Sequence, residues 1–135
     1  MKRNDVEHQI QKAAIEQLDH LFSLRWPEWM IELEDSKGRK RKVAPIYAVP
    51  NGGNRNLLTA VKLRNEGARS GVWDLAMDIP TTKYSCLRIE VKTPKGRLSK
   101  NQVAWRQHYD SIGAEHIVCY SAQEIVNCVI VYMEG

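Results

Sequence analysis

Glu90 and Lys92 in the segment RIEVK have the chemistry of a catalytic acid and base held two residues apart. Apolar and charged residues alternate over residues 87–92, which is typical of a β-strand with two different faces. This pattern predicts that Glu90 and Lys92 lie on the same face, about 6.5 Å apart along the strand. A second acid, Asp74, lies in the earlier apolar segment GVWDLAMDIP.

If these two strands pair, Asp74 and Glu90 converge, and their negative charges repel each other unless a cation lies between them. Carboxylate oxygens suit Mg²⁺ or Mn²⁺ and suit a soft metal poorly. Such an ion polarises a phosphoryl oxygen, and Lys92 could orient the nucleophile or neutralise charge that develops on the phosphate. The three residues therefore indicate a phosphodiester-cleaving centre. Exposed strands also alternate acids and bases in cross-strand pairs, and this interpretation stays open from the pattern alone.

Glu7 belongs to the stripe that a helix over residues 4–22 presents to the core, together with Ile10, Ala14, Leu18 and Leu21. A carboxylate on that side is costly unless something positive meets it. Glu7 also suits the positive N-terminal end of a helix, so the helix terminus and a functional site are equally good explanations.

The residues after Glu90 are basic. Lys95, Arg97 and Lys100 follow in a loop that leads to a helix expected over residues 99–112, with Gly113 as its stop. Ser99 and Gln102 have the spacing of a capping box, so Gln102 has a structural explanation beside any functional one. An earlier basic run, around Gly38, is interpreted as a solvated turn.

The remaining elements follow from periodicity and turn signals. They are an irregular or hairpin segment over 23–42, strands over 46–49, 71–80, 84–92 and 116–120, and helices over 55–66 and 121–133. Asn54 is expected to cap the first of these two helices, with Leu57, Ala60 and Val61 facing inward. Alternation over 71–80 predicts Trp73, Leu75 and Met77 on one face of a strand and Asp74 on the other. Strands with interleaved helices predict a mixed α/β sandwich around a small sheet.

The overall composition narrows the class of protein. A chain of 135 residues with a net charge of +4 fits one globular domain over residues 1–135 that has an acidic partner such as nucleic acid. Three cysteines without a close pair, and no signal-peptide pattern, favour a reducing cytoplasm. No apolar run is long enough for a membrane helix, no glycine-rich loop suggests a nucleotide cofactor, and the histidines lack zinc-ligand spacing.

Several linked motifs resemble one nuclease family. The order Glu7, Asp74 and then IEVK resembles the PD-(D/E)XK nucleases, and four longer segments look like the VRR-NUC domain: VPNGGNR, LRNEGARSGVWDL, IEVKTPKGRLSKNQVAW and GAEHIVCYSAQEIV. The similarity extends over about residues 5–130, nearly the whole chain. One departure is Trp73, where this family often has proline before the aspartate. It should matter little for metal binding, because its side chain is expected to point away from the face that carries Asp74.

The resemblance implies a restriction-endonuclease-like α-β-β-β-α-β core and a Mg²⁺- or Mn²⁺-dependent nuclease. It implies metal ligands at Glu7, Asp74, Glu90 and the backbone carbonyl of Val91, with Lys92 catalytic and Gln102 near the site. Phosphate contacts are then expected from Lys95, Arg97 and Lys100, and more weakly from Asn51, Asn54 and Arg55.

The resemblance also implies a homodimer that cleaves four-way (Holliday) DNA junctions in a bacterial cell or a phage-infected host. No target-recognition domain or long insertion is visible, which disfavours sequence-specific restriction. A flap- or nick-processing nuclease, and a non-catalytic DNA-binding module on the same fold, are the alternatives. The aromatic residues of the 23–42 segment, Trp26 and Trp29 with Met30, are either interface residues or a cap over one end of the sheet.

Overall fold

A four-stranded mixed sheet forms the centre of the protein. The structure is a computed structural model that describes residues 2–50 and 57–135. The sheet has the order β3-β4-β5-β6, in which β3 pairs antiparallel with β4, β4 antiparallel with β5, and β5 parallel with β6. Its strands are Ile46–Ala48 (β3), Leu75–Met77 (β4), Leu87–Val91 (β5) and Glu115–Cys119 (β6).

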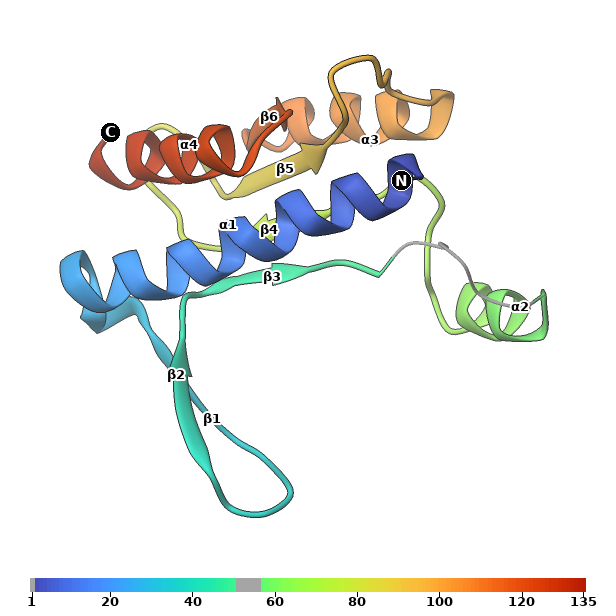
Figure 1. The fold of residues 1–135 in the computed structure, drawn as a ribbon. Helices are drawn as coiled ribbons and strands as arrows, with labels where there is room; N and C mark the ends of the chain where they lie inside the picture. Colours follow the sequence, from blue (N-terminus) through green and yellow to red (C-terminus); the bar gives the residue numbers. More distant parts are fainter. Residues whose placement is uncertain (1, 51–56) are drawn as a thin grey trace.

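Helices cover both faces of this sheet, and together with it they complete the predicted α-β-β-β-α-β core. Figure 1 shows α1 running across one face with α4 beside it, while α3 lies on the other side. The helices are Arg3–Arg25 (α1), Leu57–Asn65 (α2), Lys100–Ser111 (α3) and Ala122–Glu134 (α4). None of the described helices is long and apolar enough to cross a membrane.

The main core lies between the sheet and the pair α1 and α4. Ala14, Leu18 and Phe22 of α1 are fully buried there, while Leu21, expected on the same stripe, is only partly buried. The inward side chains of β5 complete this core, as their alternation predicts. The opposite face of β5 carries Arg88 and Glu90, and Lys92 follows in line just after the strand.

A smaller second core lies beneath α3. It contains Trp73, Cys86, Tyr109 and Ala114. The prediction that Trp73 shares a face with Leu75 is wrong, because β4 begins only at Leu75 and the chain bends at Asp74. The bend directs Trp73 towards α3, whereas Leu75 and Met77 enter the main core.

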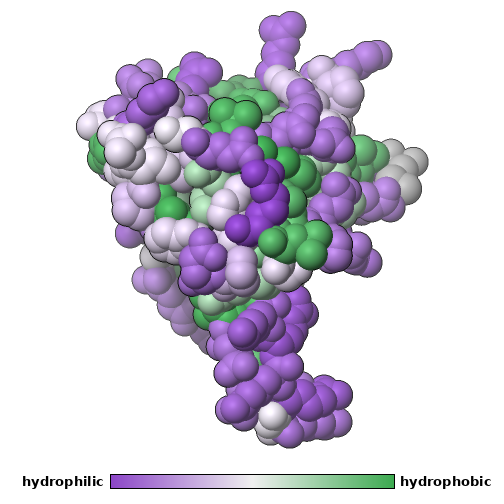
Figure 2. Space-filling model, turned by 90° about the vertical axis from the view of Figure 1, so that its left-hand side faces the viewer, coloured by the Kyte–Doolittle hydropathy of each residue, from purple (hydrophilic) through white to green (hydrophobic). Residues whose placement is uncertain are grey.

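Two elements project from this body. The hairpin of β1 (Ile31–Glu34) and β2 (Lys40–Val43) extends away from the sheet in Figure 1, after a short 3-10 helix at Pro27–Trp29. Figure 2 shows the hairpin as a largely hydrophilic projection. Asp19 of α1 holds its base, since one carboxylate oxygen accepts from the Ala44 N–H at 2.8 Å and the other from Arg41 at 3.4 Å.

The other projecting element, α2, differs from its prediction on one side chain. Val61 was expected to face inward but is 37% exposed, because α2 stands apart from the body and offers no deep core to enter (Figure 1). Gly67, with a φ of 107°, ends the segment, since a positive φ favours glycine. The expected cap Asn54 lies outside the described residues.

Candidate functional site

The sheet register brings the two acids together. Leu75 of β4 pairs with Ile89 of β5, so the next position along each strand places Asp74 opposite Glu90. The carboxylate of Asp74 accepts a hydrogen bond from the backbone N–H of Val91 at 2.9 Å. This bond fixes Asp74 against the strand that carries Glu90 and Lys92.

Glu90 and Lys92 are the two charged residues among the buried side chains of the described chain, with 2% and 8% of their surface exposed. The Lys92 ammonium lies 3.6 Å from Glu90 Oε2. The aliphatic part of Lys92 lies under the following loop, where a Cβ on Gly96 would be 3.3 Å from the lysine Cδ. Because both side chains are buried, the interpretation of this strand as an exposed alternating strand is wrong. Burying two charges is also costly, so their presence here needs an explanation.

Gln102 serves the helix and the site together. Its side-chain oxygen accepts from the Ser99 N–H at 2.9 Å and its backbone N–H donates to Ser99 Oγ at 3.2 Å, which completes the capping box. Its side-chain amide nitrogen donates to Glu90 Oε2 at 2.9 Å. The capping box is therefore confirmed, and the same side chain also contacts Glu90.

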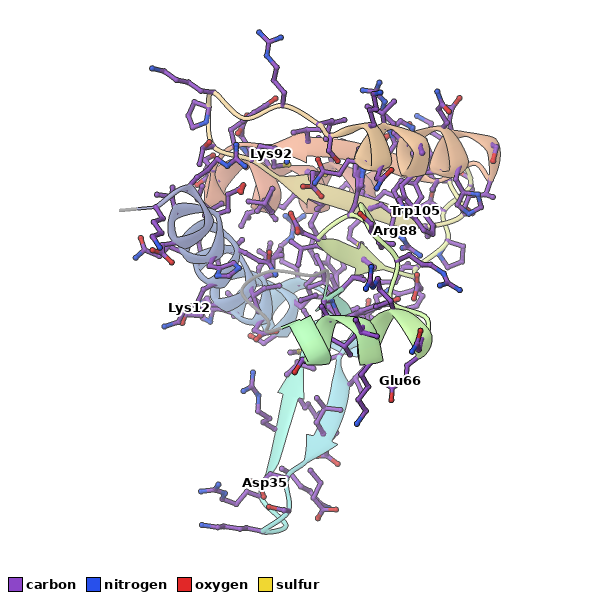
Figure 3. The ribbon with its side chains drawn as sticks, turned by 90° about the vertical axis from the view of Figure 1, so that its right-hand side faces the viewer. Lys12, Asp35, Glu66, Arg88, Lys92 and Trp105 are labelled. Carbon is purple, nitrogen blue, oxygen red and sulfur yellow. The ribbon has the colours of Figure 1, made fainter. Side chains whose placement is uncertain are left out.

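Glu7 lies on the partly buried side of α1, near the other acids. Burial raises the pKa of its carboxyl group, while the charges of Lys92 and Arg3 lower it and that of Asp74 raises it. Figure 3 shows Lys92 at the end of the sheet beside the N-terminal end of α1, far from Asp35 at the hairpin tip. The first helix thus delivers Glu7 to the same end of the sheet as Asp74 and Glu90.

The electrostatics of this cluster favour a cation. Burial, followed by the charge of Asp74, raises the pKa of Glu90 to about 8. Burial also raises the pKa of Asp74, against the opposing effect of its bond from Val91. Glu7 Oε2 and Glu90 Oε1 are buried without a hydrogen-bond donor anywhere in the described part of the chain. A proton, a positive ion or a water molecule can satisfy such oxygens, and a positive ion also offsets the repulsion between the acids.

The basic loop lies next to this cluster. Lys95, Arg97 and Lys100 are exposed on the chain that leads from β5 into α3, and their charges are therefore accessible to a large anionic partner. Asn51, Asn54 and Arg55 lie outside the described residues. Val91, whose carbonyl the resemblance places at the site, is the last residue of β5, between Glu90 and Lys92.

One residue that sequence reasoning undervalued is Trp73. It was expected to matter little for metal binding, which stays a prediction, but its indole N–H donates to the main-chain oxygen of Gln102 at 3.0 Å. The available signal was the unusual residue type itself, a large aromatic at a place where proline is common.

This arrangement of an acid pair, a buried lysine and an α-β-β-β-α-β core is that of the PD-(D/E)XK nuclease class. The sequence model of the VRR-NUC domain family matches residues 5–123, so the chain belongs to this family. A solved structure described as a VRR_NUC domain protein superimposes with a TM-score of 0.68, covering 95% of this chain and 88% of that one. The two sequences are 19% identical, so this likeness shows the fold. Comparison with curated proteins gives no match.

Proposed function

We propose that this protein, acting as a single VRR-NUC domain over residues 1–135, is a metal-dependent DNA endonuclease that prefers four-way junctions. The observation that carries the proposal is the pair of buried oxygens, Glu7 Oε2 and Glu90 Oε1, that lack a donor in the described chain beside the buried Lys92. A site that served stability alone would leave these oxygens at a free-energy cost without benefit. A site that binds a metal ion for phosphodiester cleavage would explain why this cost is tolerated.

The donor set fits Mg²⁺ or Mn²⁺, because it consists of oxygens only. Asp74, Glu90 and the carbonyl of Val91 would hold the ion, with Glu7 as a further ligand. In the described residues no three acidic, histidine or cysteine side chains are gathered closely enough to hold an ion together. We therefore assign the larger share of binding to the paired acids Asp74 and Glu90.

When bound, the ion supplies positive charge that polarises a phosphoryl oxygen and acidifies water. The side chains of the protein do the rest. Lys92, held 3.6 Å from Glu90, is placed to neutralise negative charge that develops on the phosphate. Gln102 holds Glu90 Oε2 and so fixes the orientation of that carboxylate.

DNA is the substrate that the surroundings of the site support. The exposed cations Lys95, Arg97 and Lys100 flank the acids and would contact the phosphate backbone. The three cysteines, Cys86, Cys119 and Cys128, are free and buried, which fits the reducing cytoplasm of a bacterial cell or a phage-infected host.

A homodimer follows from the proposed junction substrate, because one site cuts one strand and a four-way junction requires two symmetric cuts. Of the aromatic candidates, Trp26 packs edge-on against Phe22, and Met30 packs on the main core. Trp29 is 44% exposed and lines an apolar groove of about 460 Å³ with Ile31, Leu33 and Tyr47. An apolar patch of this kind suits a protein interface.

The test is a cleavage panel of four-way junction, flap, single-strand and duplex DNA, with Mg²⁺, Mn²⁺ or a chelator. We expect junction cleavage with either ion, none with chelator, and none from folded Asp74→Ala or Glu90→Ala variants that still bind DNA. Wild-type rates from either variant would refute the site. Light scattering at micromolar concentration tests the dimer, and a monomer that cuts flaps would instead favour the flap nuclease.

A further inference from the structure

Trp73 connects the segment that carries Asp74 to the helix that carries Gln102. Its side chain is almost fully buried, and its indole N–H donates to the Gln102 main-chain oxygen at 3.0 Å. Its own backbone N–H donates to the hydroxyl of Tyr109 at 3.2 Å, and the two rings meet edge to face. Both bonds join the chain just before Asp74 to α3.

The segment before Trp73 also lies directly against the first turns of α3. A Cβ on Gly71 would be 2.6 Å from the carbonyl carbon of Asn101 and 2.8 Å from the Gln102 nitrogen, so only glycine fits there. The Asn101 side chain donates to Ser70 Oγ at 2.9 Å, and the Trp105 indole donates to the Ser70 carbonyl at 3.0 Å. The Ser70–Trp73 segment is thus held along one side of the helix.

The position of α3 matters because the side-chain amide of Gln102 is hydrogen-bonded at both ends. Its side-chain oxygen is occupied by the Ser99 N–H and its amide nitrogen by Glu90 Oε2, each at 2.9 Å. With both ends of the amide engaged, the main-chain position of Gln102 determines where its amide meets Glu90. The indole of Trp73 holds that main chain directly.

We infer that Trp73 is a positioning residue for the acid pair: its indole N–H holds Gln102, and thereby Glu90, in register with Asp74. The inference rests on the proposed nuclease function. The proline that resembling nucleases often carry at this place has no side-chain donor and could not make this bond.

The test replaces Trp73 with Phe, which keeps an aromatic ring in the second core and removes the donor. The matched control is Cys86→Ala, which disturbs the same core at a residue whose thiol lies 3.6 Å from Ser85 Oγ, away from the Trp73–Gln102 bond. In the metal-free protein, NMR should show the side-chain amide resonances of Gln102 shifted or broadened in W73F and unchanged in C86A. In junction cleavage, kcat should fall about tenfold in W73F, since small misplacements of reacting groups are costly. The KM for DNA should stay within about twofold, because phosphate contacts come from other residues.

Unchanged Gln102 resonances in W73F, or a W73F kcat within about twofold of the C86A value, would overturn the inference. If W73F does not fold, the double variant Asn101→Ala/Trp105→Phe takes its place, because it removes both hydrogen bonds between Ser70 and α3 and keeps an aromatic ring at position 105. It should shift the same resonances and lower kcat with KM retained, and its failure to do either also overturns the inference. A wild-type protein that cleaves no DNA refutes the proposed function, whereas the Gln102 resonances still decide the positioning.

Discussion

The buried Glu90 predicts an unusual dependence of stability on pH in the metal-free protein. Burial and the neighbouring Asp74 raise its pKa to about 8, from an ordinary value of 4.5. A carboxyl group whose pKa is raised on folding binds a proton more tightly in the native state. Its contribution to stability is therefore complete below about pH 4.5 and is lost as the pH rises through about 8.

The size of the effect follows from the coupling between proton binding and folding. One proton held in the native state but released in the unfolded state changes the free energy of unfolding by about 1.4 kcal/mol per pH unit. Between about pH 5 and pH 8 the metal-free protein should lose a few kcal/mol of stability from this residue. Glu90→Gln has no proton to lose, so this part of the pH dependence should disappear. Bound Mn²⁺ should stabilise the native state as the proton does, because a bound cation replaces the proton.

Urea denaturation of wild type and Glu90→Gln, at about pH 5, 6.5 and 8 with chelator, measures the difference. A parallel wild-type series with Mn²⁺ should show a stabilisation that grows as the pH rises. Asp74 and Glu7, whose pKa values burial also raises, leave a residual slope of the same sign in the variant. Superimposable pH profiles for the two proteins would refute the idea that Glu90 is a desolvated acid awaiting a cation.

Further predictions concern the surroundings of the acids. Lys92→Ala should lower kcat by at least about two orders of magnitude while DNA affinity is retained, as measured by single-turnover cleavage beside a binding titration; a small effect would remove Lys92 from the chemistry. Lys95→Ala or Arg97→Ala should instead weaken DNA binding and reduce the slope of log affinity against log salt by about one unit each; kinetic losses equal to that of Lys92→Ala would contradict this division. Gly71→Ala should lower the urea midpoint markedly, because its Cβ would lie 2.6 Å from Asn101 and its φ of 83° disfavours a side chain; an unchanged midpoint would show that the segment is not held against α3.

Much of this protein could be predicted from local pattern. Alternation along β5 placed Glu90 and Lys92 on one face, away from the apolar side chains that enter the main core. The Ser99–Gln102 spacing predicted a capping box, and Gly113, with a φ of 74°, ends α3 as expected. These features depend on residues within a few positions of one another, so the periodicities of 2.0 and 3.6 residues are enough to find them.

Other features depended on elements that are distant in the sequence. Trp73 left the predicted alternation because the bend at Asp74, and the space beneath α3, decided which core it enters. Val61 had an inward position on a helical pattern, but α2 has little core to face. Local periodicity could not predict the burial of either side chain, because burial depends on what packs against an element.

The sequence by itself determined the residue types of the site, their order along the chain and the face of the strand from which Glu90 and Lys92 project. Only the tertiary structure decided that Asp74 and Gln102 contact this strand and that Glu7 lies at the same end of the sheet. It also decided that two carboxylate oxygens are buried there without donors among the described residues. The physical reason is that alternation reports the direction of a side chain, whereas desolvation and the resulting pKa shifts depend on every element that excludes water from it.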